Sequence, residues 1–290
     1  MSKLRIGTCS WKYDSWKGLV YPDVPNINYL KEYSEKYNTV EIDQWFWSLY
    51  GERKISLPKF HDVESYSQSV PNDFMFTIKI PNCITLTHYY KKSKNEPLKK
   101  NPFFLSEELT TEFLKTLEPM KSNLGPLMFQ FEYLNRDKMP SQQDFQIQFG
   151  NYAEKLDENY LWGVEIRNPN YINKPYFEFL NEFKLIPVFL QGYFMPSIFE
   201  IIEKHIELLP STIVIRLHGS DRKGIEEKSS GNWDEIIEPK DEEIYKLTGL
   251  IQKLQSKEID IYINVNNHYE GSAPLTIERI NKTLNQKRGE

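Results

Sequence analysis

Eight short runs of β-forming residues alternate along this chain with longer segments whose apolar residues recur at helical spacing. That alternation is typical of parallel βα units. Eight such units within 290 residues predict an α/β fold, a TIM (β/α)8 barrel, with residues 1–290 forming a single domain. The predicted strands are residues 4–10, 39–45, 74–80, 126–131, 162–167, 186–191, 212–218 and 260–266.

The two faces of these predicted strands differ in polarity. Side chains alternate along a strand, and the face of a barrel strand that meets the helices must be apolar. Val40 and Ile42 are therefore expected to face the helices, while Glu41 and Asp43 point into the barrel. The same rule places further polar side chains inside, near the carboxyl ends of their strands: Thr77, Lys79, Gln130, Glu165, Arg167, Arg216, His218, Asn264 and Asn266. We expect them to converge on one mouth of the barrel, where active sites of this fold lie.

Charges inside a barrel must be compensated, because an isolated buried charge costs several kcal/mol. The acids and bases on the inward face are equal in number: Glu41, Asp43 and Glu165 against Lys79, Arg167 and Arg216. They form either a buried salt-bridge network with a structural role only, or a ligand site. We favour the ligand site.

Residue chemistry suggests roles within such a site. Arg167 and Arg216 are candidates for binding an anionic substrate, because a planar guanidinium binds carboxylate or phosphate bidentately; the alternative is a salt bridge to Glu165 or Glu41. His218 and Glu41 are candidates for proton transfer, with Glu165 as an orienting carboxylate. His218 is otherwise a neutral, hydrogen-bonded imidazole. The other inward groups are hydrogen-bonding candidates: Lys79, Gln130, Asn264 and Asn266.

Large aromatic residues follow the first two predicted strands. The stretch IGTCSWKYDSWKG contains Trp11, Tyr13 and Trp16, and residues 45–47 read WFW. We expect Trp11 and Trp45 to belong to an apolar wall of the pocket, suited to stacking on a sugar, a base or another flat ligand. Packing beneath the following loops is the alternative.

Residues 81–105 form a long connection after the third predicted strand. A loop of this length is unusual unless it covers a site or is disordered, so this one is a candidate lid. It carries His88, a candidate substrate-binding residue, and a lysine-rich stretch within residues 91–100 whose charge could attract anions. A solvated lysine face explains the same residues without a function.

Cofactor motifs give little support for a bound group. The chain has neither GxGxxG nor GxxxxGK[ST], and its 5 histidines form no HxH or HExxH pattern, so no cofactor is predicted. A divalent metal remains chemically feasible, because carboxylates and imidazoles can ligate one together. Its ligands would come from one set: Glu41, Asp43, Glu165, His88 and His218.

Composition limits the classes of partner and the location that we expect for this protein. The formal net charge is −5 and the basic residues are scattered, which disfavours nucleic acid as a partner without excluding a nuclease. There is no signal peptide and no apolar run of about 20 residues, so we expect a cytoplasmic protein without a membrane partner. Cys9 and Cys83 are expected to be reduced thiols. The oligomeric state is left open.

In their order along the chain, the strand-end motifs resemble those of the domain of unknown function 72 family, also called YecE-like proteins. The motifs are GTCSW, NTVEID, FTIKIP with ITLTH, LGPLMFQF, GVEIRNPNY, VIRLHG and INVNNHYEG. The resemblance spans nearly the whole chain and implies a TIM barrel with an unassigned activity. It also adds Asn267, next to Asn266, to the candidate substrate-binding residues.

These observations favour an enzyme that acts by acid/base chemistry on a small anionic or polyhydroxylated molecule at the carboxyl-terminal mouth of the barrel. Hydrolase, isomerase and lyase chemistry all fit. Two alternatives stay open: a divalent-metal-dependent phosphodiesterase acting on nucleic acid, and a noncatalytic ligand-binding protein.

Overall fold

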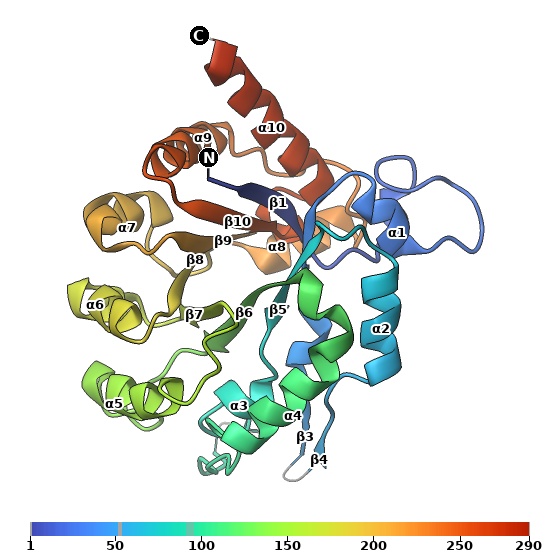
Figure 1. Ribbon diagram of the computed structural model, residues 1–290. Helices are drawn as coiled ribbons and strands as arrows, with labels where there is room; N and C mark the ends of the chain where they lie inside the picture. Colours follow the sequence, from blue (N-terminus) through green and yellow to red (C-terminus); the bar gives the residue numbers. More distant parts are fainter. Residues whose placement is uncertain (1, 52–53, 92, 94, 290) are drawn as a thin grey trace.

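The barrel predicted from the sequence is present in the computed structural model, which describes residues 2–51, 54–91, 93 and 95–289. Within these residues, eight parallel strands close in the order β1-β10-β9-β8-β7-β6-β5-β2, and β2 pairs with β1 (Figure 1). Their bounds are β1 Leu4–Cys9, β2 Thr39–Ile42, β5 Met75–Lys79, β6 Leu124–Phe131, β7 Trp162–Ile166, β8 Ile186–Gly192, β9 Thr212–Gly219 and β10 Asp260–Val265. The chain is therefore an α/β TIM barrel.

Most of the helices surround the barrel in chain order, as Figure 1 shows. Several begin at a side chain that accepts hydrogen bonds from the otherwise unpaired first amides, as Asn28, Ser106, Ser141 and Asn173 do. The helices are α1 Tyr29–Ser34, α2 Phe60–Gln68, α3 Asn82–Thr85, α4 Glu107–Leu117, α5 Gln142–Ala153, α6 Lys174–Glu182, α7 Ile198–His205, α8 Arg222–Ser229, α9 Asp241–Ser256 and α10 Ala273–Gly289. Among the described residues, no helix is long and apolar enough to cross a membrane.

Two apolar layers confirm the predicted alternation along the strands. Val40 and Ile42 belong to the large core between the strands and the helices. A second, smaller cluster fills the barrel interior from alternate positions on the strands: Met128, Ile186, Val188, Val214 and Tyr262. Polar side chains occupy the same inward face further along the strands, so they lie near the carboxyl ends.

The second strand is shorter than predicted. It ends at Ile42, because Asp43 adopts a helical backbone conformation (φ −106°, ψ −18°) that starts a 3-10 helix, η2 Gln44–Phe46. The chain then forms a small hairpin of β3 Leu49–Tyr50 and β4 Lys54–Ile55, which the sequence pattern did not indicate. Two-residue strands are too short to show a period.

The connection after β5 is partly packed into the fold, and two of its residues, Leu86 and Tyr90, line the cavity described below. Residues 82–88 are buried and include α3. The amide of Asn101 fastens this part by donating to the carbonyl oxygens of Cys83 and Leu86, both at 2.7 Å. The first half of the connection is therefore packed structure, and only residues beyond it reach the surface. Of the lysine-rich stretch, Lys91, Lys99 and Lys100 are exposed, whereas Lys92 and Lys94 lie outside the described residues.

Candidate functional site at the barrel mouth

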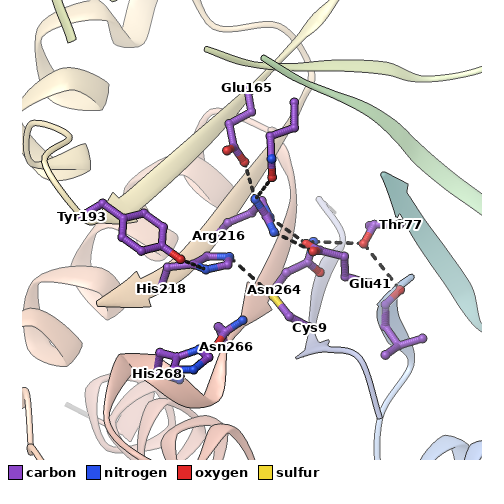
Figure 2. Close-up of polar contacts among 12 residues, drawn as sticks. Cys9, Glu41, Thr77, Glu165, Tyr193, Arg216, His218, Asn264, Asn266 and His268 are labelled. Atoms are coloured by element: carbon purple, nitrogen blue, oxygen red, sulfur yellow. Dashed lines mark hydrogen bonds and ion pairs between the residues drawn. The ribbon is translucent and has the colours of Figure 1, made fainter. Parts of the chain in front are cut away.

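Arg216 lies at the centre of the polar layer (Figure 2). It reaches inward from β9 and binds Glu41 of β2 with two parallel contacts, Nε to Oε2 at 2.7 Å and Nη2 to Oε1 at 2.6 Å. Its Nη1 donates to Glu165 Oε2 on β7 and to Gln130 Oε1 on β6, the latter at 3.2 Å. One guanidinium thus joins strands from different sides of the barrel.

The charges in this network stabilise one another. Burial opposes the charged form of Arg216, but Glu165 and Glu41 outweigh it and raise the Arg216 pKa well above its usual value. Burial alone would raise the pKa of Glu165; the guanidinium groups of Arg216 and Arg167 instead hold it at about 2. Asn264 completes the network by donating to Glu41 Oε2 at 3.1 Å and to Thr77 Oγ1 at 3.0 Å.

For Arg216 the structure therefore favours the salt-bridge interpretation over substrate binding. The side chain is 2% exposed, and three of its nitrogens are engaged by protein groups. Glu41 and Glu165 are equally engaged, because each of their carboxylate oxygens accepts from Arg216, Arg167 or Asn264. Glu41 is therefore not poised for the proton transfer expected from the sequence, whereas Glu165 holds the guanidinium groups of Arg167 and Arg216.

Arg167 has spare hydrogen-bonding capacity. Its Nε donates to Glu165 Oε1 at 2.8 Å, and its guanidinium lies 5.4 Å from the ring centre of Tyr193. Its Nη1 and Nη2 have no hydrogen-bond partner within the described part of the chain. A guanidinium held by one edge presents its remaining donors to a ligand.

Lys79 lies at the end of β5, and its amine is buried. Its side chain is 9% exposed, and Nζ lies 4.1 Å from the ring centre of Phe46. No hydrogen bond or salt bridge joins this amine to any residue the structure describes. Burial, helped by the positive charge of Arg216, lowers the Lys79 pKa to about 8. A fraction of these amines is therefore neutral near physiological pH.

His218 is a neutral imidazole rather than one that titrates near neutrality. Burial, followed by repulsion from Arg216 and Arg167, lowers its pKa well below the usual value. The Tyr193 hydroxyl lies 3.3 Å from Nδ1, and the Cys9 thiol lies 3.8 Å from Nε2 (Figure 2). His218 is thus suited to donating and accepting hydrogen bonds at neutral pH. The cysteines Cys9 and Cys83 are both free.

A cavity of about 430 Å³ opens above this network, within the size range of small-molecule sites. Six of the predicted site residues line it: Lys79, Gln130, Arg167, Arg216, His218 and Asn266. Asp43 also lines it, and burial, together with the charge of Glu41, raises the Asp43 pKa. The cavity wall contains the aromatic side chains of Tyr13, Phe46, Trp47 and Tyr90.

Seven predicted site residues do not line the cavity. Three of them, Glu41, Glu165 and Asn264, belong to the network around Arg216, and the other four lie elsewhere. Trp11 is core, with its ring edge-on to Tyr66 at 5.0 Å, and Trp45 stacks on the same ring at 5.6 Å. Their packing alternative is the correct one, since the wall is made by their neighbours along the chain. His88 is buried against Thr87, with 3.0 Å between Nδ1 and Oγ1. Asn267 accepts from the amide of Ala273 at 2.9 Å and so fixes the start of α10.

Some lining residues were missed by the sequence reasoning. Tyr193 comes directly after β8, Arg222 lies a few residues after β9, and His268 follows Asn266 closely. His268 Nε2 lies 2.9 Å from Glu226 Oε1, to which Arg222 also donates at 2.9 Å. The available signal was position: all three residues follow the carboxyl ends of strands, where this fold builds its sites.

Two of the candidate metal ligands, Glu41 and Glu165, are not free to bind a divalent metal. Hard cations need free carboxylate or carbonyl oxygens, whereas the oxygens of Glu41 and Glu165 are taken by cationic side chains. In the described ranges, no group of three or more His, Cys, Asp and Glu side chains is arranged to hold a metal ion. A metal at Glu41 and Glu165 would have to displace Arg216 from both.

Fold and site together define a (β/α)8-barrel protein with a mixed-charge cavity at the carboxyl-terminal mouth. The sequence model described as "Protein of unknown function DUF72" matches residues 5–290, and the chain belongs to this family. A DUF72 family protein from Enterococcus faecalis is similar in structure, with a TM-score of 0.66, 19% sequence identity and coverage of 98% of each chain. Another, from Thermotoga maritima, has a TM-score of 0.63 and 21% identity, covering 99% of this chain and 100% of its own. None of the curated proteins compared matches the chain.

Proposed function

We propose that this protein is an enzyme that acts on a small molecule carrying an anionic group, bound in the cavity at the barrel mouth. The observation that carries the proposal is the contrast between the two arginines. Arg216 is saturated by buried carboxylates, whereas Arg167 lines the cavity with donors left over. A carboxylate or phosphate is the group that such a guanidinium binds best.

Other cavity groups suit hydroxyls and proton transfer. Gln130, His218 and Asn266 offer neutral hydrogen-bonding side chains. Lys79 and Asp43 are better placed than Glu41 and Glu165 to exchange protons, since neither is locked into a salt bridge and their pKa values are shifted toward neutrality. Acid/base chemistry by this pair is compatible with hydrolysis, isomerisation or lyase reactions. The cytoplasmic location favoured by the sequence belongs to the same proposal.

Titration calorimetry with small anions tests the binding step. Pyruvate, lactate and glycerol 3-phosphate are suitable probes because each carries one anionic group and fits the cavity volume. Removing a charged hydrogen bond costs about 1.5–3 kcal/mol, so Arg167→Ala is expected to weaken binding by about 10- to 100-fold. The matched control is Arg136→Ala, an exposed arginine outside the cavity.

Equal affinities in the wild type and Arg167→Ala would contradict the proposal. Nuclear magnetic resonance of the same mixtures then separates an enzyme from a binding protein. Conversion of an Arg167-dependent ligand supports catalysis, and its recovery unchanged supports the noncatalytic alternative.

A further inference from the structure

The polar network explains why the Lys79 amine has no polar partner among the residues that the structure describes. A buried lysine normally pairs with a carboxylate. Here the buried acids Glu41 and Glu165 already give their oxygens to Arg216, Arg167 and Asn264. Lys79 is left with the face of the Phe46 ring on one side and the cavity on the other.

An amine in this setting can act as a nucleophile. Lysines that form covalent intermediates are typically desolvated beside an apolar side chain or another cation, which keeps part of the amine unprotonated. Both conditions hold at Lys79, through Phe46 and Arg216. From this geometry we infer that Lys79 forms a Schiff base with a carbonyl group of the substrate. The inference rests on the proposed function and makes it more specific: the substrate is an aldehyde or ketone that also carries an anionic group.

The covalent step balances with groups that line the cavity. The neutral amine of Lys79 adds to the carbonyl carbon, the C=O π electrons move to oxygen, and a proton shifts from nitrogen to that oxygen to give a carbinolamine. The carboxyl group of Asp43 then donates one proton to the departing hydroxyl, which leaves as water. The products are an iminium ion on Lys79 and an Asp43 carboxylate, so neither oxidant nor reductant is required.

Arg167 supplies the second point of attachment. It lines the same cavity as Lys79, and its free Nη donors can hold a carboxylate or phosphate while the carbonyl faces the amine. Short 2-oxo acids are the simplest compounds with both groups and fit a cavity of about 430 Å³.

Reductive trapping on the full chain tests the inference. The protein is mixed with pyruvate and cyanoborohydride at pH 7, and the labelled lysine is located by peptide mass mapping. Because a lysine in water is almost wholly protonated at pH 7, an amine with a pKa of about 8 has on the order of a hundred-fold more of the reactive form. Lys79 is expected to be labelled faster than the exposed Lys174 by about that factor.

Variants and a second probe keep the outcomes distinct. Lys79→Arg is expected to abolish the fast labelling, and Lys174→Arg is expected to leave it intact. The comparison of Lys79 with Lys174 in the wild type remains valid even if a variant fails to fold. Labelling of Lys79 no faster than Lys174 overturns the inference. Lactate has no aldehyde or ketone group that could react with an amine. If lactate still binds in an Arg167-dependent way, the proposed function survives the failure of the Schiff-base inference. If lactate binding is lost as well, both fall.

Discussion

Arg216 is one cation shared by two buried carboxylates. Burying charged groups costs several kcal/mol each, and only close pairing with good hydrogen bonds compensates for it. The parallel contacts to Glu41 and the further contacts to Glu165 and Gln130 meet that condition. Arg216 is therefore a positioning residue: it fixes the acids, which in turn leave Arg167 and Lys79 facing the cavity.

Removing Arg216 should destabilise the fold. Arg216→Met keeps much of the side-chain volume but leaves Glu41 and Glu165 buried without their shared cation. Breaking a buried pair in this way costs roughly 3–5 kcal/mol. Urea unfolding measures the loss, with Arg136→Met as an exposed control that changes stability by less than about 0.5 kcal/mol. Similar losses in the two variants would refute the network's role.

The lowered pKa of Glu165 predicts that the folded protein loses stability in acid. Its pKa is about 2 in the folded protein, against a reference value of 4.5. A depressed pKa means that the stabilisation is complete above about pH 4.5 and is lost as the pH falls toward 2. We expect about 3 kcal/mol of unfolding free energy to disappear over that interval. Urea unfolding at several pH values checks this, and Glu165→Gln should remove that part of the pH dependence.

The lowered pKa of Lys79 predicts the opposite: burying this amine lowers the stability of the folded protein. Its pKa in the folded protein, about 8, lies below the reference value of 10.5. The penalty for burying its charge is therefore complete below about pH 8 and vanishes as the pH rises to 10.5. Lys79→Met should raise the unfolding free energy by about 1–3 kcal/mol at pH 7, and the gain should shrink at pH 10. A loss of stability at pH 7 would show that the amine has a structural partner.

Among the secondary-structure elements, the strands place the site and the following segments complete it. Period-two alternation predicts which residues face inward, and this succeeded for Glu41, Lys79, Glu165 and Arg216 because the apolar helices demand the opposite face. Alternation gives no information on segments without a period. The turn at Asp43 and the positions of Trp11 and Trp45 could not be predicted for that reason.

The first half of the connection after β5 is packed structure, which the sequence did not indicate. Asn101 satisfies two buried carbonyl groups within it, those of Cys83 and Leu86. Asn101→Ala leaves both unpaired and should cost about 1–3 kcal/mol. Hydrogen exchange provides the local measurement: amides of residues 83–88 should be protected in the wild type and exchange faster in the variant. Rapid exchange of these amides in the wild type would restore the lid interpretation.

At the level of the whole molecule, the barrel is layered along its axis. Apolar side chains such as Met128 and Tyr262 fill one end of the interior, the charged network crosses it, and the cavity opens at the other end. The sequence predicts these layers because polarity changes along each strand. It does not predict which acid pairs with which base, because pairing depends on strand order and side-chain reach across the barrel. The pairing of acids with bases decides whether Arg167 or Arg216 is left free to bind a ligand.

A crystal structure of the protein in complex with pyruvate tests most directly whether Arg167 or Arg216 binds the ligand. We expect the carboxylate to lie within hydrogen-bonding distance of Arg167 Nη1 or Nη2, and the carbonyl carbon to lie next to Lys79 Nζ or to be bonded to it. Arg216 should keep its contacts with Glu41 and Glu165. A pyruvate carboxylate bound by Arg216, with either acid released from it, would contradict the account.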